Sequence, residues 1–139
     1  MRVVVDTNIL ISALINPAGV PFTLYNLWNQ KQFDLVTSTW QIEEVRDVTR
    51  RPHLKDDFKP HTAGRMINEL RKSAFVLDEL PEVDYSPDPK DNPVLVSGIA
   101  GQVQYIVSGD KRDMLELETV QGIPIVTARR FVGLFMDVD

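Results

Sequence analysis

The feature that most constrains this chain is a short apolar run that ends at a carboxylate. Residues 2–5 read Arg-Val-Val-Val, and Asp6 follows them. Three consecutive β-branched residues without polar alternation predict a strand that is buried on both faces, as in a parallel sheet covered by helices. Asp6 then stands at the carboxyl end of that strand, the edge where open α/β sheets bind ligands. Its alternative role is to cap the helix predicted at 8–14, which aspartate does well.

Strands and helices alternate along the rest of the chain. Ser38 followed three residues later by Gln41 predicts a capping box at a helix start, and Thr127 predicts a second helix cap. We predict strands at 2–5, 34–37, 74–77, 104–108 and 123–126, and helices at 8–14, 20–32, 38–51, 61–73, 91–101, 109–117 and 127–135. This order predicts one α/β domain over residues 1–139, with a parallel sheet between helical layers.

Composition removes several classes of protein. The chain has no cysteine, which excludes disulfide scaffolds, thiol catalysis and cysteine-type zinc sites, and agrees with a cytoplasmic protein. No apolar run approaches the roughly 18 residues of a membrane-spanning helix, so we expect no membrane segment. The 15 basic and 20 acidic residues give a net charge of −5, which argues against binding nucleic acid by charge alone.

Helical geometry predicts different environments for two adjacent acids on the helix at 38–51. At about 100° per residue, the buried face is defined by Ile42, Val45 and Val48. Glu44 lies about 100° from the centre of that face and Glu43 about 160° away. Glu44 is therefore expected to border the sheet and is the better functional candidate, whereas Glu43 is expected to face water.

Four acids share a position near element junctions or the edge of the sheet. They are Asp6, Glu44, Asp91 and Asp110. Each has an ordinary explanation alone, such as the capping of a helix by Asp91. Together they indicate carboxylates that converge on one edge, where their mutual repulsion is costly unless a cation lies among them. Mg²⁺ or Mn²⁺ suits such an all-oxygen site.

Five stretches in their order along the chain resemble the PIN-domain family. They are VVVDTNILISAL, STWQIEEV, DPKDNPVLVSGIAG, YIVSGDKRDML and GIPIVTARRF. The resemblance implies a three-layer α/β/α sandwich with strand order 3-2-1-4-5. It also implies a metal-dependent ribonuclease, with Asp6, Glu44, Asp91 and Asp110 matching the family acids. The chain looks most similar to the small toxins of prokaryotic toxin–antitoxin pairs.

Neighbouring residues are candidates for supporting roles. Asp113 follows Asp110 by three residues and is either an extra metal ligand or an acid favoured by the helix dipole. Three polar residues beside these acids, Thr7, Asn8 and Ser108, are candidates for orienting a carboxylate or holding a metal-bound water. Their alternative role is to cap a helix. Asp88 is expected to form a turn.

Basic residues near the predicted junctions are candidate contacts for RNA phosphates, against a default role as solvated charge. They are Arg46, Arg50, Lys111, Arg112, Arg129 and Arg130. One cation, or two roughly 3.5–4 Å apart, would hold the scissile phosphate and activate a water, with Glu44 or Asp110 accepting its proton. The resemblance implies products with a 5′-phosphate and a 3′-hydroxyl, a small antitoxin partner and a homodimer.

Two other functions remain open at this point. A degenerate PIN fold would bind RNA or protein without catalysis, although all four family acids are present. A magnesium-dependent phosphotransfer domain of the receiver type has a similar topology, since fold alone does not determine function. Receiver domains need a phosphoacceptor aspartate at the end of the third strand. Here the residue at that position, Asp78, leads into an acidic loop, and no strongly matching lysine follows the fifth strand, so this alternative is weaker.

Overall fold

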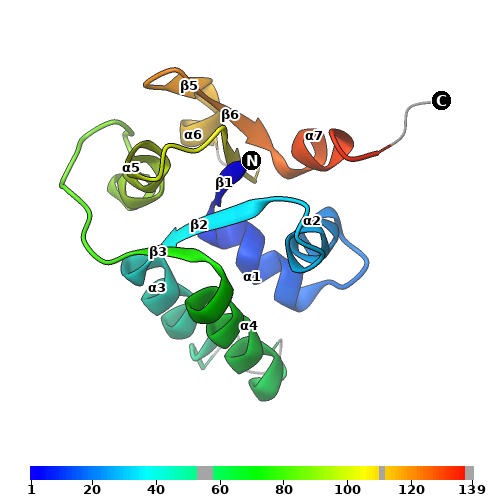
Figure 1. Ribbon diagram of the computed structural model, residues 1–139. Helices are drawn as coiled ribbons and strands as arrows, with labels where there is room; N and C mark the ends of the chain where they lie inside the picture. The colour runs from blue at the N-terminus through cyan, green and yellow to red at the C-terminus, as the bar shows by residue number, and fades with distance from the viewer. Residues whose placement is uncertain (53–57, 110–111, 137–139) are drawn as a thin grey trace.

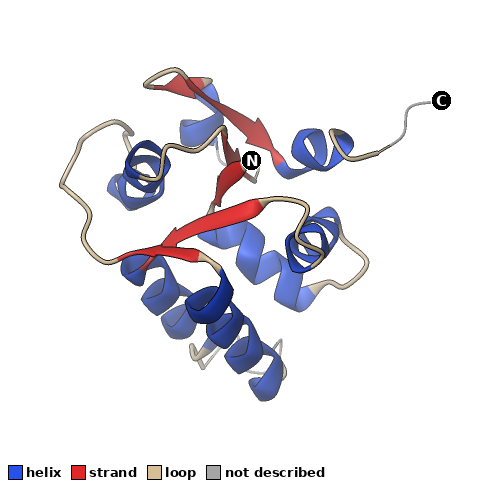
Figure 2. Cartoon of the chain, in the orientation of Figure 1, coloured by secondary structure: helices blue, strands red, loops and turns tan. Residues whose placement is uncertain are grey.

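The computed structural model describes residues 1–52, 58–109 and 112–136, with the backbone alone for Pro60, Arg112 and Asp113. Strands and helices alternate as the sequence predicts, with element ends shifted by a few residues (Figure 2). The elements are β1 (Arg2–Val5), α1 (Thr7–Ile15), α2 (Val20–Asn29), β2 (Asp34–Ser38), α3 (Thr39–Thr49), α4 (Pro60–Ser73), β3 (Phe75–Leu77), the 3₁₀ turn η2 (Pro89–Asp91), α5 (Asn92–Ala100), β4 (Tyr105–Ser108), α6 (Arg112–Glu116), β5 (Thr119–Val120), β6 (Ile123–Thr127) and α7 (Ala128–Gly133).

The sheet has the order β3-β2-β1-β4-β6-β5. The first five of these strands pair in parallel, and β6 is the strand predicted fifth from the sequence. The predicted order 3-2-1-4-5 is therefore confirmed for the parallel strands. Strand order reverses between β1 and β4, so the topological switch point lies at the carboxyl ends of these two strands.

The short strand β5 is absent from the prediction. It pairs with β6 in antiparallel fashion, and Val120 lies opposite Ile123. The two residues between them, Gln121 and Gly122, have φ angles of 50° and 80°. Positive φ at both turn positions is typical of the tightest hairpin turn, whose usual sequence signal is Asn-Gly or Asp-Gly. A two-residue strand beside Gln-Gly lacks both the alternation and that signal.

Helices cover both faces of the sheet (Figure 1). The side chains of Val3 and Val5 belong to a core cluster with α1 to α4 and α7, whereas Val4 belongs to a second cluster with α5 and α6. All three valines are at most 1 % exposed. Their burial, worth about 1.5 kcal/mol or more each, confirms that β1 is covered on both sides.

The direction of α5 places its first turn near the carboxyl ends of the strands. Because α5 connects two parallel strands of one sheet, it runs antiparallel to them. At its far end, the carbonyl of Gly101 accepts a hydrogen bond of 3.2 Å from Arg2 at the start of β1. A Cβ atom on Gly101 would lie 2.7 Å from Val36 Cγ1, so glycine permits this close approach. The opposite end of α5, which Asp91 precedes, therefore lies toward the carboxyl edge.

Within the described part of the chain, no single helix has both the length and the apolar character needed to cross a membrane. Helices α1 and α2 satisfy those criteria only as a pair that is bent by 100°. Both helices contribute side chains to the larger core cluster.

Candidate active site

Asp6 lies at the carboxyl end of β1 and is only 3 % exposed. It occupies the position before α1, but its side chain makes no capping hydrogen bond. The Ser108 hydroxyl, at the end of the neighbouring strand β4, instead donates to Asp6 Oδ2 at 3.3 Å. Capping therefore does not explain this carboxylate, which instead accepts a hydrogen bond from the neighbouring strand.

Gln41 connects α3 with the ends of β1 and β2. Its amide Nε2 donates to the Val5 carbonyl at 2.6 Å and to Thr7 Oγ1 at 3.3 Å. Thr37 Oγ1 donates to its Oε1 at 2.5 Å. The predicted capping box is therefore only half correct, because Ser38 Oγ accepts from the Gln41 backbone while the Gln41 side chain is used elsewhere.

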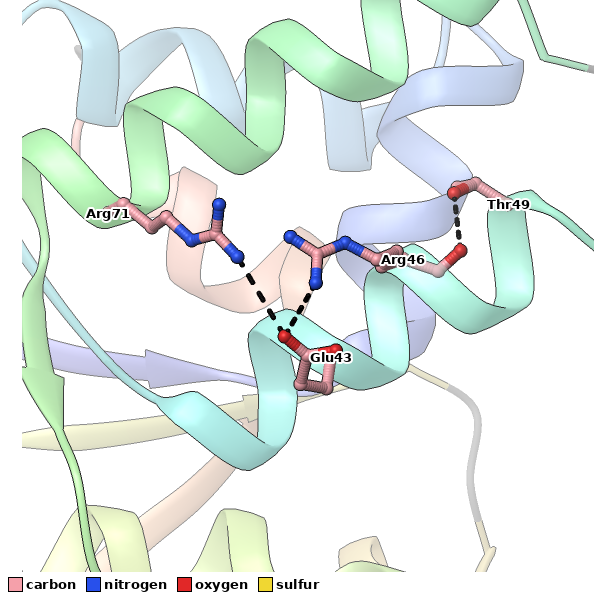
Figure 3. A network of polar contacts seen from close by, with 4 residues as sticks. All are labelled: Glu43, Arg46, Thr49 and Arg71. Carbon is pink, nitrogen blue, oxygen red and sulfur yellow. Dashed lines mark hydrogen bonds and ion pairs between the residues drawn. The ribbon is translucent and has the colours of Figure 1, made fainter.

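The two adjacent glutamates of α3 lie in different environments, as predicted. Glu44 is half-buried, whereas Glu43 is exposed. The Glu43 carboxylate pairs with Arg46 at 2.7 Å on its own helix and with Arg71 of α4 at 3.8 Å (Figure 3). Glu43 thus belongs to a surface ion-pair network on the α4 side. Glu44 lies on the same face of α3 as Gln41, because residues three apart are neighbours on a helix.

Asp91 is almost completely buried, with 1 % exposure. It stands before α5, but the predicted capping by its side chain is wrong. The Ser86 hydroxyl donates to Asp91 Oδ2 at 3.1 Å. Asn92 Oδ1 accepts from the backbone amides of Tyr85 and Ser86 at 3.0 Å each. The loop before α5 is thereby held against the helix start, and Asp91 is enclosed at the carboxyl edge of the sheet.

A cleft of about 510 Å³ opens over the switch point. Asn8, Gly109 and Thr127 line it, and they come from the carboxyl ends of β1, β4 and β6. The remaining lining residues are Ile9, Ser12, Val20, Pro21, Ala128 and Arg129. We refer to it as the switch-point cleft. Ligands of open α/β sheets bind in this kind of crevice.

A second cleft, of about 490 Å³, opens over β2 and β3. Its lining residues are Trp40, Asp78, Leu80, Pro81, Glu82, Val83, Pro89, Asn92 and Pro93. We refer to it as the outer cleft. Trp40 lies in the first turn of α3, and Asp78 comes directly after β3, so this cleft also lies at the carboxyl edge of the sheet.

Some predicted site residues lie outside what the structure describes. Asp110 and Lys111 are not described, and the side chains of Arg112 and Asp113 are not described either. In the part that is described, no three acidic, histidine or cysteine side chains are grouped closely enough to hold a metal ion. Asp88 accepts a hydrogen bond from a backbone amide two residues later at 3.0 Å, as expected of a turn former.

The basic candidates separate by location. Arg46 is engaged with Glu43, and Arg50 lines a different hollow beside α4, so neither lines the switch-point cleft. Arg129 does line it and is exposed. Thr127 caps α7 as predicted, accepting from the Arg130 amide at 3.1 Å, and thereby orients the helix start that carries Arg129. Gln41 is the contact that sequence reasoning missed, because its Val5 partner is 36 positions away in the chain.

Comparison with known proteins agrees with this geometry. No curated protein matches the chain. The family model described as PIN domain matches residues 2–112, which is well over half of the 139 residues. The match includes β1 with Asp6, α3 with Glu44, and the segment before α5 with Asp91. The chain therefore belongs to the PIN domain family, whose members are generally nucleases.

Proposed function

We propose that this protein is a metal-dependent endoribonuclease whose site is the carboxyl edge of the sheet at the switch point. The observation that carries the proposal is the burial of two carboxylates at this edge. Asp6 and Asp91 are 3 % and 1 % exposed, and the residues next to Asp6 in the sequence lead into Asn8, which lines the switch-point cleft together with Arg129. Carboxylates that gather at one edge repel each other, and a cation among them relieves that repulsion.

The donors at this edge fit a hard divalent cation. They are carboxylate oxygens, supported by the hydroxyls of Ser108 and Ser86, and such all-oxygen sets suit Mg²⁺ or Mn²⁺. The proposal assigns Asp6, Asp91 and Asp110 as ligands, with Asp110 following the cleft residue Gly109 in the sequence. When bound, the cation supplies positive charge that polarises the scissile phosphate.

The chain's own groups account for the remaining chemistry. Glu44, half-buried on the inner face of α3, accepts the proton of the attacking water. The water oxygen bonds to phosphorus while the bond from phosphorus to O3′ breaks. O3′ leaves as an alkoxide and takes a proton from solvent water to become a hydroxyl, while the other product keeps a 5′-phosphate. Arg129 contacts a phosphate of the strand that lies in the switch-point cleft.

The test compares Asp6→Asn with Asp34→Asn. Asp34 is an exposed aspartate at the start of β2, at the opposite edge of the sheet. Asparagine keeps the acceptor for Ser108 but removes a charged ligand. We expect Asp6→Asn to reduce Mn²⁺-dependent cleavage of labelled single-stranded RNA roughly 100-fold or more. We also expect Asp34→Asn to cleave as the unchanged protein does.

Melting curves complete this test. A cation that binds only the folded protein raises Tm by mass action, so Mn²⁺ should raise the Tm of the unchanged protein and of Asp34→Asn. Asp6→Asn should show a smaller rise, with a metal-free Tm that is equal or higher because like-charge repulsion is relieved. Full activity and an undiminished Mn²⁺ effect in Asp6→Asn would remove Asp6 from the site and defeat the proposal.

We extend the proposal to the biological role of a toxin that a small antitoxin protein holds inactive. The support is that the five sequence stretches resemble the small toxins of prokaryotic toxin–antitoxin pairs, and that the chain belongs to the PIN domain family. Expression of the unchanged protein should arrest bacterial growth, expression of Asp6→Asn should not, and the product of an adjacent small reading frame should restore growth. Normal growth on expression of an active nuclease would remove the toxin role while leaving the chemistry in place.

A further inference from the structure

The Gln41 side chain is almost fully enclosed, with 3 % exposure, and both ends of its amide are hydrogen-bonded. The carbonyl oxygen accepts from Thr37 of β2, and the nitrogen donates to the backbone of Val5 and the hydroxyl of Thr7. One side chain of α3 thus joins the carboxyl ends of two neighbouring strands. A buried polar group is retained at low cost only when its partners are all present.

Two of the hydrogen-bond partners of Gln41 flank Asp6 in the sequence. Val5 immediately precedes this acid, and Thr7 immediately follows it. The amide therefore bonds to the backbone of the residue before Asp6 and to the side chain of the residue after it, while Ser108 bonds to the Asp6 carboxylate from β4. Movement of Gln41 would break the hydrogen bonds from α3 to Val5 and Thr7 but would keep the hydrogen bond from Ser108 of β4 to Asp6.

Gln41 lies on the side of α3 that faces the strand ends, next to the buried side chains of Ile42 and Val45. Glu44 is three residues further along and shares that face. On the opposite side of the helix, Glu43 is tied to Arg71 of α4 (Figure 3). The exposed ion pair contributes little, typically below about 1 kcal/mol, whereas the buried amide has specific partners at fixed distances. Gln41 therefore adds a directional contact to the core packing of Ile42 and Val45 on α3.

We infer that Gln41 is a positioning residue that holds Glu44 of α3 in register with Asp6 of β1 at the site. This inference rests on the proposed function, because it assigns Gln41 a role in that same reaction. Gln41 touches neither substrate nor metal and acts through the two acids. Outer groups that orient ligands in this way typically change activity or metal affinity by about 10- to 100-fold when they are replaced.

Gln41→Met tests this with a side chain of similar length that cannot hydrogen-bond. Thr37→Val is the milder companion, since it removes the hydroxyl partner and keeps the β-branched shape that suits a strand. Tyr25→Phe is the matched control, because it removes a hydrogen bond between α2 and Glu69 of α4 and does not line the switch-point cleft. All are compared at a temperature where each is folded.

We expect Gln41→Met to lower kcat about 10-fold or more, with KM nearly unchanged, and to raise the Mn²⁺ concentration needed for half of the full Tm shift. Thr37→Val should change both quantities about threefold. The double variant should be no worse than Gln41→Met, since both substitutions break one network. Tyr25→Phe should lower the metal-free Tm and leave kcat and the Mn²⁺ midpoint unchanged.

The outcomes are distinguishable. If the unchanged protein shows neither RNA cleavage nor a Mn²⁺-dependent Tm shift, the proposed function fails and the role of Gln41 fails with it. If the unchanged protein shows both, and Gln41→Met lowers Tm without changing kcat or the Mn²⁺ midpoint, Gln41 is only a structural contact and this inference alone is overturned. Should Gln41→Met not fold, an unchanged Mn²⁺ midpoint in folded Thr37→Val overturns it equally.

Discussion

The switch-point cleft and the outer cleft are nearly equal in size, at about 510 and 490 Å³, and both lie at the carboxyl edge of one sheet. They differ in charge. Among the residues that the structure describes, those that line the switch-point cleft include Arg129 and no acid, whereas those that line the outer cleft include Asp78 and Glu82 and no basic residue. Volume therefore does not separate the two clefts, whereas topology and local charge favour the switch-point cleft as the proposed RNA site.

Under the proposed function, this difference explains how an acidic protein would bind RNA, which is a polyanion. The net charge of −5 opposes RNA over the whole surface. Phosphate contacts depend on the nearby side chains rather than on the total, because salt screens exposed charges beyond about 8 Å at physiological ionic strength. The outer cleft, with exposed Asp78 and Glu82, repels phosphates at close range. The strand is therefore expected to lie over β1, β4 and β6.

The largest effect is expected at Glu44, the proposed general base on α3. Glu44→Gln should lower kcat for RNA cleavage roughly 100-fold, because removal of a general base typically costs 10²–10⁴-fold. Glu43→Gln, the adjacent control, should cleave within about twofold of the unchanged protein, since its ion pairs are exposed. Single-turnover cleavage rates at saturating Mn²⁺ measure both. Equal losses in the two variants would contradict the assignment of Glu44 to the inner face of α3.

A smaller effect is expected from charge in the switch-point cleft. Arg129→Ala should raise KM for RNA about three- to tenfold and reduce the slope of log KM against log salt by about 0.7, the value for one phosphate contact on a single strand. Glu82→Gln in the outer cleft is the control and should leave KM and its salt slope unchanged. If Glu82→Gln and Arg129→Ala change KM in the same direction and to the same extent, the proposal that RNA contacts the switch-point cleft and not the outer cleft is contradicted.

A neutral contact in the same cleft should act differently from a charged one. Asn8 is exposed and lines the cleft beside Asp6. Asn8→Ala removes a hydrogen-bonding amide, so KM should rise roughly threefold with an unchanged salt slope. Titrations of cleavage rate against RNA concentration at several salt concentrations separate the two cases. A change of salt slope in Asn8→Ala would mean that its effect is transmitted through the charged groups.

The smallest effect concerns a contact away from both clefts and affects stability alone. Burial, followed by the hydrogen bond to Glu69, raises the pKa of Tyr25 above its ordinary value of 10.0. Tyr25→Phe should lose about 1 kcal/mol of the free energy of unfolding near neutral pH. Because the folded pKa is raised, the contribution of Tyr25 is fully present below pH 10.0 and is lost as pH rises toward the folded value.

Urea denaturation of the two proteins measures this contribution, because other titrating groups cancel in the difference. The gap in unfolding free energy between the unchanged protein and Tyr25→Phe should narrow above pH 10.0. A gap that widens there would reverse the expected linkage. RNA cleavage by Tyr25→Phe near neutral pH should match that of the unchanged protein, which keeps this contact separate from both clefts.

The regular elements were predictable because local patterns specify them. The three valines of β1 indicated a strand covered on both faces, and their side chains do divide between two core clusters. The periodicity of α3 also separated Glu43 from Glu44 correctly. The hairpin formed by β5 and β6 was missed for two reasons. A two-residue strand such as β5 is too short to show periodicity, and the turn residues Gln121 and Gly122 are not a common hairpin signal.

Site residues were predictable as residue types, but their partners were not. The sequence left capping open as the alternative role of Asp6 and predicted it for Asp91, since aspartate before a helix usually caps it. In the structure their side chains accept from Ser108 and Ser86 instead. A capping preference reflects only the adjacent backbone. The actual partner depends on which hydroxyl the packing of another strand or loop brings within reach.

The sequence by itself determined the α/β alternation, the caps at Ser38 and Thr127, and the candidate acids, because these depend on residues a few positions apart. Only the tertiary structure decided that Gln41 bonds to Val5, 36 positions away, and that Ser108 meets Asp6 across 102 positions. It also decided which of two similar clefts lies over the switch point. Local propensity acts through the neighbouring backbone, whereas these contacts exist only once strands distant in the sequence pair and the helices pack on them.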